Sequence, residues 1–210
     1  MTENYDYKAN TYETNKINLL SNPTSLYSKQ PTVYYGLMYL AKNAKKEVKI
    51  HTPYIICNDY MYNELKNIKV PTTIMTNSAE NNGNIFGAVD YLSHKKDIID
   101  TGVTIKEYEG GISYHGKSMT IDDDIAIVGS FNMDMRSAYI DTELMLVINS
   151  KDINKQLKAS MEEYEKKAAT VKNETEYSHI PEGMKMKELS DKKKNIKAWF
   201  GWAMNGLRFL

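Results

Sequence analysis

The sequence predicts an α/β fold, in which a sheet is covered by helices on both faces, and three observations predict it. Short apolar runs typical of strands alternate with segments whose apolar residues recur at helical spacing. Loop-forming Asn, Ser, Gly and Pro separate the two kinds of segment. The chain of 210 residues is 41% hydrophobic, which is enough to bury a core. In such a fold the loops at the strand ends are available for ligand binding.

The first segment, residues 1–30, is predicted to be an extended or loosely held lead-in arm. It is rich in Asn, Thr, Ser and Tyr and has one short apolar pair, Leu19 and Leu20. Pro31 suits the first turn of a helix. The residues after it carry the helical spacing of a buried stripe, at Val33, Leu37, Leu40, Ala41 and Ala44.

Two strand-and-helix units follow this helix. Residues 47–50 alternate and run into HTPYIIC, which predicts a strand ending near His51 and a short helix with Asp59 as its N-cap. Val70 to Met75 predicts the next strand, in which Pro71 is tolerable only near the beginning or on a sheet edge. The sequence TNSAENNG, residues 76–83, predicts a loop.

The second helix of these units is predicted to begin at Asn84 as its N-cap and to end at Gly102, before a strand at 103–108. Its inward-facing residues are predicted to be Phe86, Val89 and Leu92.

The C-terminal part begins with the last strongly apolar strand, Leu144 to Ile148. A long helix follows, and we expect the core to close with it, so the folded domain is predicted to span 31–172. Its apolar stripe is Ile153, Leu157, Met161, Tyr164 and Ala168.

Residues 173–210 predict a Lys-rich linker and an amphipathic C-terminal tail. The tail would lie on a membrane or dock on its own domain or a partner chain, and the pattern does not choose between them. Its apolar stripe is Ile196, Trp199, Phe200, Ala203, Leu207 and Leu210.

Composition narrows the function classes. Lys plus Arg and Asp plus Glu are 27 each, so no overall charge draws the chain to nucleic acid. Cys57 is the single cysteine, which excludes an internal disulfide, and we interpret it as a packing residue. The polar residues 1–16 predict no secretion signal, and no run approaches the roughly 20 apolar residues that span a bilayer. The expected location is cytoplasmic, with peripheral contact at the membrane face.

Residues 114–143 concentrate the polar chemistry of the chain. His115 and Lys117 lie two apart, so on an extended strand both side chains leave the same face, and a phosphate could sit across them. Ser130 and Asn132 follow the apolar run Ile125–Val128, where a buried strand breaks into a loop. Their hydroxyl and amide donors can bind phosphate oxygens.

These residues carry a resemblance to a known family. Residues 115–132 satisfy the pattern H-x-K-x4-D-x6-G-S-x-N, and the chain is thereby identified as a member of the phospholipase D superfamily. The segment GSFNMDMRSAYIDTE resembles the form GSxNxDxRSxxxNxE of bacterial cardiolipin synthases, with Met135 in place of a frequent Pro and Asp141 of a frequent Asn. HTPYII and TNS also resemble strand ends of that subgroup, so the resemblance covers about residues 20–150. The specified positions are His115, Lys117, Asp122, Gly129, Ser130 and Asn132.

The resemblance implies phosphodiester cleavage through a covalent phosphohistidine, with no cofactor and no metal. A phosphodiester repels nucleophiles, so the site must neutralise its oxygens and supply both an attacking group and a proton. By resemblance, Lys117 and Asn132 would hold the phosphate oxygens and Ser130 would add a hydroxyl. Glu143 would orient a motif His through its second ring nitrogen. Asp122 is interpreted mainly as a structural residue near the site.

Several other polar residues are interpreted as structural. Asp134 and Arg136 are expected to fix the motif loop. The run Asp122 to Asp124 reads as a turn, because adjacent acids cannot converge on one calcium ion. The remaining histidines are predicted to be structural or exposed: His51, His94 and His179.

The family's site needs two such motifs, and this sequence contains one, since no second H-x-K occurs among its four His. The resemblance therefore implies a phospholipase D-like mixed sheet that is one half of a bilobal or dimeric enzyme. The second motif would come from an identical chain or from a longer polypeptide, and similarity to the second half of cardiolipin synthases favours the latter. In such tandem enzymes His115 would protonate the leaving alcohol; in a symmetric homodimer it could take either role.

Three functions follow from these observations. The leading one is phosphatidyl transfer from a phospholipid such as phosphatidylglycerol to a second alcohol or to water. The second is a nuclease-like phosphodiesterase, because compact members with one motif cleave nucleic acid as dimers; the balanced charge counts against nucleic acid as a partner. The third is an inactive or partner-dependent half-enzyme.

Overall fold

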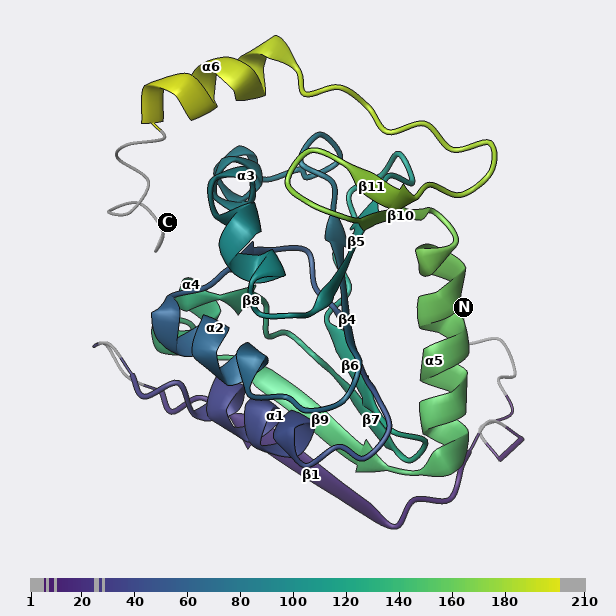
Figure 1. Ribbon diagram of the computed structural model, residues 1–210. Coiled ribbons are helices and arrows are strands. Elements are labelled where there is room, and N and C mark those ends of the chain that lie inside the picture. Colours follow the sequence, from purple (N-terminus) through teal and green to yellow (C-terminus); the bar gives the residue numbers. More distant parts are fainter. Residues whose placement is uncertain (1–5, 7, 10, 25–26, 28, 201–210) are drawn as a thin grey trace.

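The fold is built around a nine-stranded mixed sheet, seen in a computed structural model that describes residues 6, 8–9, 11–24, 27 and 29–200 (Figure 1). The strand order is β1-β9-β7-β6-β2-β4-β5-β10-β11. Its central strands β2, β4 and β5 are parallel, and the other pairs are antiparallel. These strands are β1 (Lys16–Ser21), β2 (Val48–His51), β4 (Thr72–Asn77), β5 (Thr104–Tyr108), β6 (Ser118–Ile121), β7 (Ile125–Gly129), β9 (Leu144–Asn149), β10 (Ala168–Val171) and β11 (Tyr177–His179).

Helices cover both faces of this sheet, as predicted. In Figure 1, α1, α2, α3 and α4 lie on one side of it and α5 lies alone on the other. A small parallel pair, β3 (Ile55–Ile56) with β8 (Met133–Asp134), lies on the side of α3. The helices are α1 (Thr32–Lys42), α2 (Asp59–Lys66), α3 (Ile85–Ile99), α4 (Met135–Tyr139), α5 (Lys151–Glu165) and α6 (Asp191–Phe200).

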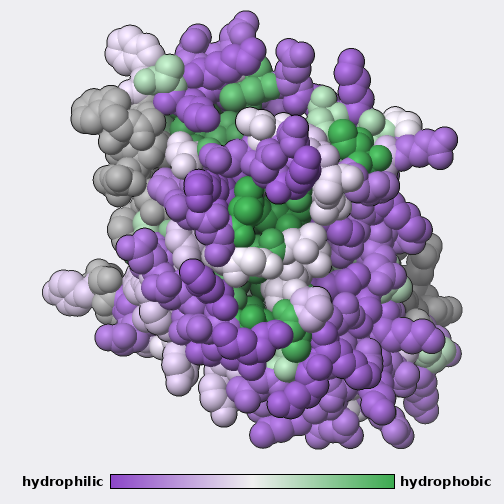
Figure 2. Space-filling model, in the orientation of Figure 1, coloured by the Kyte–Doolittle hydropathy of each residue, from purple (hydrophilic) through white to green (hydrophobic). Residues whose placement is uncertain are grey.

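The core consists of apolar side chains that the sheet and these helices bury together. Figure 2 shows one face of the molecule, where hydrophilic residues predominate and a narrow band of hydrophobic residues runs down the middle, between α3 and α5. Cys57 is fully buried in this core, which confirms its interpretation as a packing residue. Examples from the main cluster are Tyr34, Met38, Ile74, Met119 and Ile127.

The predicted helix ends agree with the structure with two corrections. The Asn84 side chain caps α3 by accepting from the Gly87 N–H, and Gly102 follows that helix at φ +86°, both as predicted. Asn58, one residue before the predicted Asp59, caps α2 by accepting from the Met61 N–H. Phe86 is 44% exposed instead of buried, because α3 begins at Ile85 and turns its Ala88, Tyr91 and Ile98 side to the core.

Three strands of the large sheet were not predicted, nor was the small pair β3 and β8; the three are held by pairing more than by their own apolar patterns. β1 lies within the predicted lead-in arm and pairs with β9, although five of its six residues are exposed. Ala168 begins β10 instead of continuing a helical stripe, because α5 ends at Glu165. β11 lies within the predicted linker. β4 begins after Pro71 and extends two residues into the predicted loop.

The described part of the C-terminal tail docks on its own domain. The ammonium group of Lys193 on α6 donates to the carbonyls of Ala79, Glu80 and Asn82 at 2.8, 2.6 and 3.0 Å. Trp199 on the same helix is 77% exposed. Ala203, Leu207 and Leu210 of the predicted stripe lie outside the described residues. Within the part that the structure describes, no helix has both the length and the apolarity to cross a membrane.

Candidate active site

Three neighbouring strands bring the motif residues to one end of the sheet. His115 and Lys117 lie just before β6, Ser130 just after β7, and Glu143 just before β9. The strand register joins these ends: the Gly129 N–H donates to the Lys117 carbonyl at 3.2 Å, and the Ser130 N–H donates to the Leu144 carbonyl at 2.9 Å. The antiparallel order β9-β7-β6 thus brings these four residues to the same end of the sheet.

The side chains of His115 and Lys117 lie in direct contact. The Lys117 Nζ is 3.1 Å from His115 Nδ1 and donates to the His115 carbonyl at 2.9 Å. An ammonium only donates, so Nδ1 is the acceptor and the proton of the neutral ring lies on Nε2. In this arrangement His115 presents a proton donor, Nε2–H, away from Lys117.

The electrostatics of this pair favour a neutral imidazole. Burial lowers the pKa of His115, and the adjacent Lys117 charge lowers it further. Burial also lowers the pKa of Lys117, although the charges of Glu143 and Asp134 act in the opposite direction. The Lys117 ammonium is therefore partly buried within the electrostatic influence of two carboxyl groups, and the negative charge of a phosphate would be favourable beside it.

Ser130 and Glu143 form a hydrogen-bonded pair on the next two strands. The Ser130 hydroxyl donates to one oxygen of Glu143, and the Ser137 hydroxyl donates to the other at 2.9 Å. Glu143 is buried, at 7% exposed, and no hydrogen bond among the described residues joins it to His115 of the same chain. Glu143 is thus held rigidly within the site, and its oxygens contact the loop instead of the motif His.

Asn132 lies on the loop between β7 and β8. Its Nδ2 donates to Ser137 Oγ at 3.3 Å, while its Oδ1 is buried and has no hydrogen-bond partner among the described atoms. The amide oxygen and nitrogen of Asn have nearly the same shape, so turning this amide would aim its donor where the unpaired oxygen now points. A buried amide without full pairing is available to a ligand.

Gly129 allows the strand ends to approach this closely. A Cβ at Gly129 would meet the Leu144 carbonyl oxygen at 2.1 Å and the Met145 Cα at 2.8 Å. Any other residue at this position would displace β9, and Glu143 is the residue just before that strand. The glycine of the motif therefore sets the spacing between Ser130 and Glu143.

Asp122 does not lie near the other motif residues, contrary to the prediction. It follows β6 at the end opposite to His115, and its carboxylate accepts from the backbone N–H groups of Lys45, Lys46 and Glu47. Burial alone would raise the pKa of Asp122, but these backbone hydrogen bonds outweigh it and lower the pKa. Asp122 has a positive φ of 52° and fixes the turn that leads into β2. Its role in the structure is that of an anchor, as its main interpretation held.

The other polar residues of the motif loop fix its shape, as expected. Asp134 caps α4 by accepting from the Ser137 N–H at 2.6 Å. Arg136 Nε pairs with the Asp141 carboxylate at 3.1 Å. Among the remaining histidines, His179 is exposed. His51 is 1% exposed and contacts Tyr114, the neighbour of His115, which no sequence pattern indicated.

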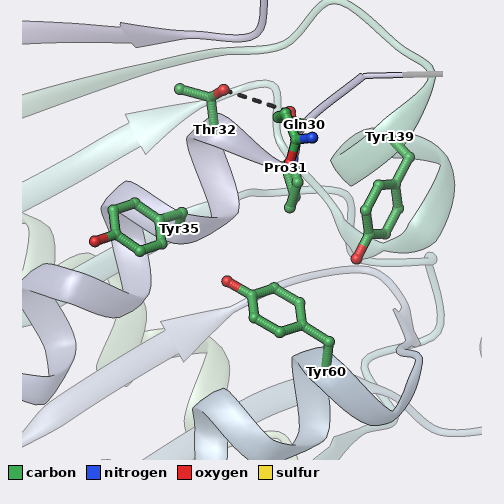
Figure 3. A pocket seen from close by; sticks show the side chains of 6 residues that line it. All are labelled: Gln30, Pro31, Thr32, Tyr35, Tyr60 and Tyr139. Atoms are coloured by element: carbon green, nitrogen blue, oxygen red, sulfur yellow. Dashed lines mark hydrogen bonds between the residues drawn. The ribbon is translucent and has the colours of Figure 1, made fainter.

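His115 and Ser130 are both exposed, so this end of the sheet is open at the surface. A cavity of about 460 Å³ lies elsewhere, where the tyrosines of three helices meet (Figure 3). None of the candidate site residues lines it. Its lining residues are Gln30, Pro31, Thr32, Tyr35, Tyr60 and Tyr139.

Comparison with known proteins agrees with this geometry. The model of the family described as "Cardiolipin synthase, PLD-like domain" matches residues 37–164. The chain belongs to the phospholipase D-like family. Cardiolipin synthase 1 of Staphylococcus epidermidis is 31% identical over 159 residues, which cover 74% of this chain and 32% of that protein. A cardiolipin synthase of Staphylococcus aureus is 32% identical over 129 residues, covering 60% and 26%. The chain thus spans about a third or less of the length of these relatives.

Solved structures with this fold confirm the predicted architecture. Phosphatidylserine synthase of Haemophilus influenzae superposes with a TM-score of 0.65 at 16% identity, covering 92% of this chain and 47% of that chain. NUC of Salmonella typhimurium, a phospholipase D family member, superposes with a TM-score of 0.59 at 15% identity, covering 74% and 97%. The predicted phospholipase D-like mixed sheet is confirmed. The matched family is described by cardiolipin synthases, which are enzymes, so this domain belongs to an enzyme family.

Proposed function

We propose that this chain supplies one half of an active site that transfers a phosphatidyl group between alcohols, as a cardiolipin synthase does. The observation that carries the proposal is the contact of His115 with Lys117 beside Ser130 at one end of three adjacent strands. An imidazole, a cation and hydroxyl and amide donors are what a phosphodiester displacement requires. The similarity to cardiolipin synthases supports a phospholipid such as phosphatidylglycerol as the substrate.

In the proposed mechanism two imidazoles share the work. The imidazole of the second motif attacks the phosphorus, an N–P bond forms, and the bond from phosphorus to the leaving alcohol oxygen breaks. When Lys117 binds the phosphate oxygens together with Ser130 and Asn132, His115 can carry a proton on both ring nitrogens; this imidazolium gives its Nε2 proton to the leaving oxygen and becomes a neutral ring. A second alcohol or water then loses its proton to Nε2 of the neutral His115 and displaces the nitrogen, which restores the His115 imidazolium and the free imidazole of the second motif. No step uses a metal or a cofactor.

The contact with Lys117 counts against His115 as the nucleophile, which leaves it the role of acid and base. A nucleophilic imidazole needs a free lone pair on Nε2, which requires the proton on Nδ1 and an acceptor beside it. In this chain Nδ1 faces an ammonium donor instead, so Nε2 carries the proton. In a homodimer one copy would have to exchange the Lys117 contact for an acceptor such as a carboxylate.

The second motif is proposed to come from a second chain or from a further part of a longer polypeptide. The exposure of His115 and Ser130 supports a site that is completed by another surface. The Glu143 carboxylate, which does not contact His115, would orient the histidine of that second motif. Residues 31–172 are proposed to form the catalytic half-domain and residues 173–210 a tail. The exposed Trp199 supports peripheral contact of this tail with the cytoplasmic face of a membrane.

The test combines mass in solution with turnover on defined substrates. The purified chain is analysed by sedimentation velocity and incubated with phosphatidylglycerol vesicles, and release of glycerol and formation of cardiolipin are measured. We expect His115→Ala to lose turnover by more than about 100-fold. Lys96→Ala, which alters an exposed ion pair on α3, is the control. Full turnover by His115→Ala would overturn the assignment.

A nuclease-like phosphodiesterase is the second candidate, favoured by the match to NUC over 97% of that chain. Cleavage of single-stranded DNA without release of glycerol would replace the first proposal by this one. A strictly monomeric chain without turnover on either substrate would contradict both activities for this chain alone and leave a half-enzyme that depends on a partner.

A further inference from the structure

Three side chains joined by hydrogen bonds, those of Glu165, His51 and Tyr114, lie beneath the segment that carries His115 and Lys117. Glu165, at the end of α5, accepts from His51 Nε2 at 3.2 Å, and His51 Nδ1 lies 3.3 Å from the hydroxyl of Tyr114. His51 is 1% and Glu165 is 9% exposed. Tyr114 directly precedes His115 in the sequence. The proposed mechanism gives no part to any of these three groups, although their last member adjoins the proposed acid.

The direction of each of these hydrogen bonds follows from the charges around the three side chains. Lys106 donates to Glu165 at 2.6 Å and Lys49 lies at 3.6 Å, so Glu165 is a carboxylate and only accepts. His51 therefore donates from Nε2. A neutral His51 has Nδ1 free as an acceptor, and the Tyr114 hydroxyl donates to it. The hydroxyl of Tyr114 is thus held at one orientation.

The backbone of Tyr114 is fixed as firmly as its hydroxyl. Asn77, at the end of β4, accepts from the Tyr114 N–H at 2.7 Å and donates to the Tyr114 carbonyl at 2.9 Å. The Tyr114 ring packs edge-on against Tyr164 with centroids 4.8 Å apart. Both ends of this residue are therefore held by strands and helices of the core, while His115 beside it is exposed.

Gly116 lies over the hydroxyl of Tyr114, between the two motif residues. A Cβ at Gly116 would come within 2.3 Å of that hydroxyl oxygen. The peptide that joins His115 to Lys117 thus rests on the end of the Tyr114 side chain. Any displacement of the hydroxyl moves this peptide, and with it the contact between Lys117 Nζ and His115 Nδ1.

We infer that Tyr114, held by His51 and Glu165, is a positioning residue that sets the geometry of His115 and Lys117. The inference rests on the proposed function of those two residues. A positioning role explains why the imidazole of His51 and the carboxylate of Glu165 are buried beneath an exposed site, at a place where apolar side chains would pack equally well. Tyr114 touches neither the substrate nor the reacting atoms in this assignment; it acts through the Gly116 peptide.

The test removes single hydroxyl or imidazole groups from the full chain. Tyr114→Phe keeps the ring packing and is expected to lower kcat on phosphatidylglycerol vesicles about tenfold, with KM changed less than about twofold. His51→Gln, which keeps a donor toward Glu165, is expected to do the same. Because both act through one hydrogen bond, the double variant should fall no more than about twofold below the lower single variant. Tyr164→Phe removes a half-exposed hydroxyl from the same ring cluster and is the matched control.

Imidazole NMR gives a second readout that needs no turnover. The His115 signals are assigned with His115→Gln, and Tyr114→Phe is expected to shift the His115 titration upward, because a looser peptide weakens the contact with Lys117. Circular dichroism checks that each variant is folded. If the wild-type chain shows no turnover, the proposed function fails while the NMR titration still judges the inference. An unchanged His115 titration in a folded Tyr114→Phe variant would overturn the inference, and so would a kcat within twofold of the wild type.

Discussion

Lys117 controls the protonation of His115, because its ammonium lies 3.1 Å from Nδ1. We expect Lys117→Met to raise the pKa of His115, since this charge adds to burial in lowering it. The chain has four His, so NMR titration can follow each ring. Turnover should fall by more than about 100-fold, because a phosphate oxygen loses its cation. Lys194→Met, on an exposed face of α6, is the control; an unchanged His115 pKa in Lys117→Met would contradict the prediction.

The spacing between Ser130 and Glu143 depends on the missing side chain of Gly129. We expect Gly129→Ala to destabilise the domain by about 2 kcal/mol or more, because the new methyl group would lie 2.1 Å from the Leu144 carbonyl oxygen. Urea unfolding measures the change. Gly83→Ala is the control, since its nearest neighbour, Ser113, lies at an ordinary 3.6 Å. Equal stability of the two variants would show that β9 moves freely.

The motif correctly predicted the site residues that lie close together because their strands are neighbours in the sequence. His115, Lys117 and Ser130 lie on adjoining strand ends, since residues that flank a tight antiparallel pair must meet. The pattern placed Asp122 wrongly, because a fixed offset in sequence does not tell which end of β6 a residue lies on. His51 and Glu165 are 114 residues apart, and their contact depends on α5 returning across the sheet.

At the scale of elements, the parallel strands and their helices were predictable and the sheet edges were not. β2 and β4 are largely buried on both faces because helices cover them, and the apolar residues Val48, Ile50, Ile74 and Met75 make these strands visible in the sequence. β1 and β11 are the two edge strands, where one neighbour and partial exposure leave little apolar signal, and β10 next to β11 has only four residues, two of them Ala. Such strands are specified by their partners, which are β9 for β1, β5 for β10 and β10 for β11.

The end of α5 is fixed to the sheet by the charge of Glu165. Burial alone would raise the pKa of Glu165, but hydrogen bonds from His51 and Lys106 and the charge of Lys49 lower it to about 2. A carboxyl group with a depressed pKa stabilises the folded state above its unfolded pKa, near 4.5, and this contribution is lost as pH falls toward 2.

We therefore expect Glu165→Gln to lower the free energy of unfolding at pH 7, by on the order of 3 kcal/mol. The difference from the wild type should shrink as the pH falls from about 4.5 toward 2. Urea unfolding at several pH values measures it. Glu163→Gln on the same helix is the control, because that side chain is 68% exposed in its pair with Lys166. A difference that does not depend on pH would contradict the assignment.

At the scale of the whole molecule, the site opens onto a surface that is partly apolar. Cross-strand pairing aligns Leu19 with Leu146, and Leu146 with Val128, so these three side chains lie on one face of the sheet. Leu19 is 61% and Val128 is 37% exposed, and Leu144, beside Glu143, is 46% exposed. An apolar surface that adjoins an exposed half-site is suited to contact the half that carries the second motif.

This surface gives a prediction about assembly. If a second copy completes the site, Val128→Lys should weaken self-association in sedimentation velocity by about tenfold or more, since a charge would be buried at the contact. Turnover per chain should fall at low protein concentration and recover as the concentration rises, because the assembled form alone holds two motifs. Ile180→Lys places the same charge beyond β11, at the opposite edge of the sheet, and should change neither quantity. Turnover that is independent of concentration in Val128→Lys would show that the second motif does not arrive across this face.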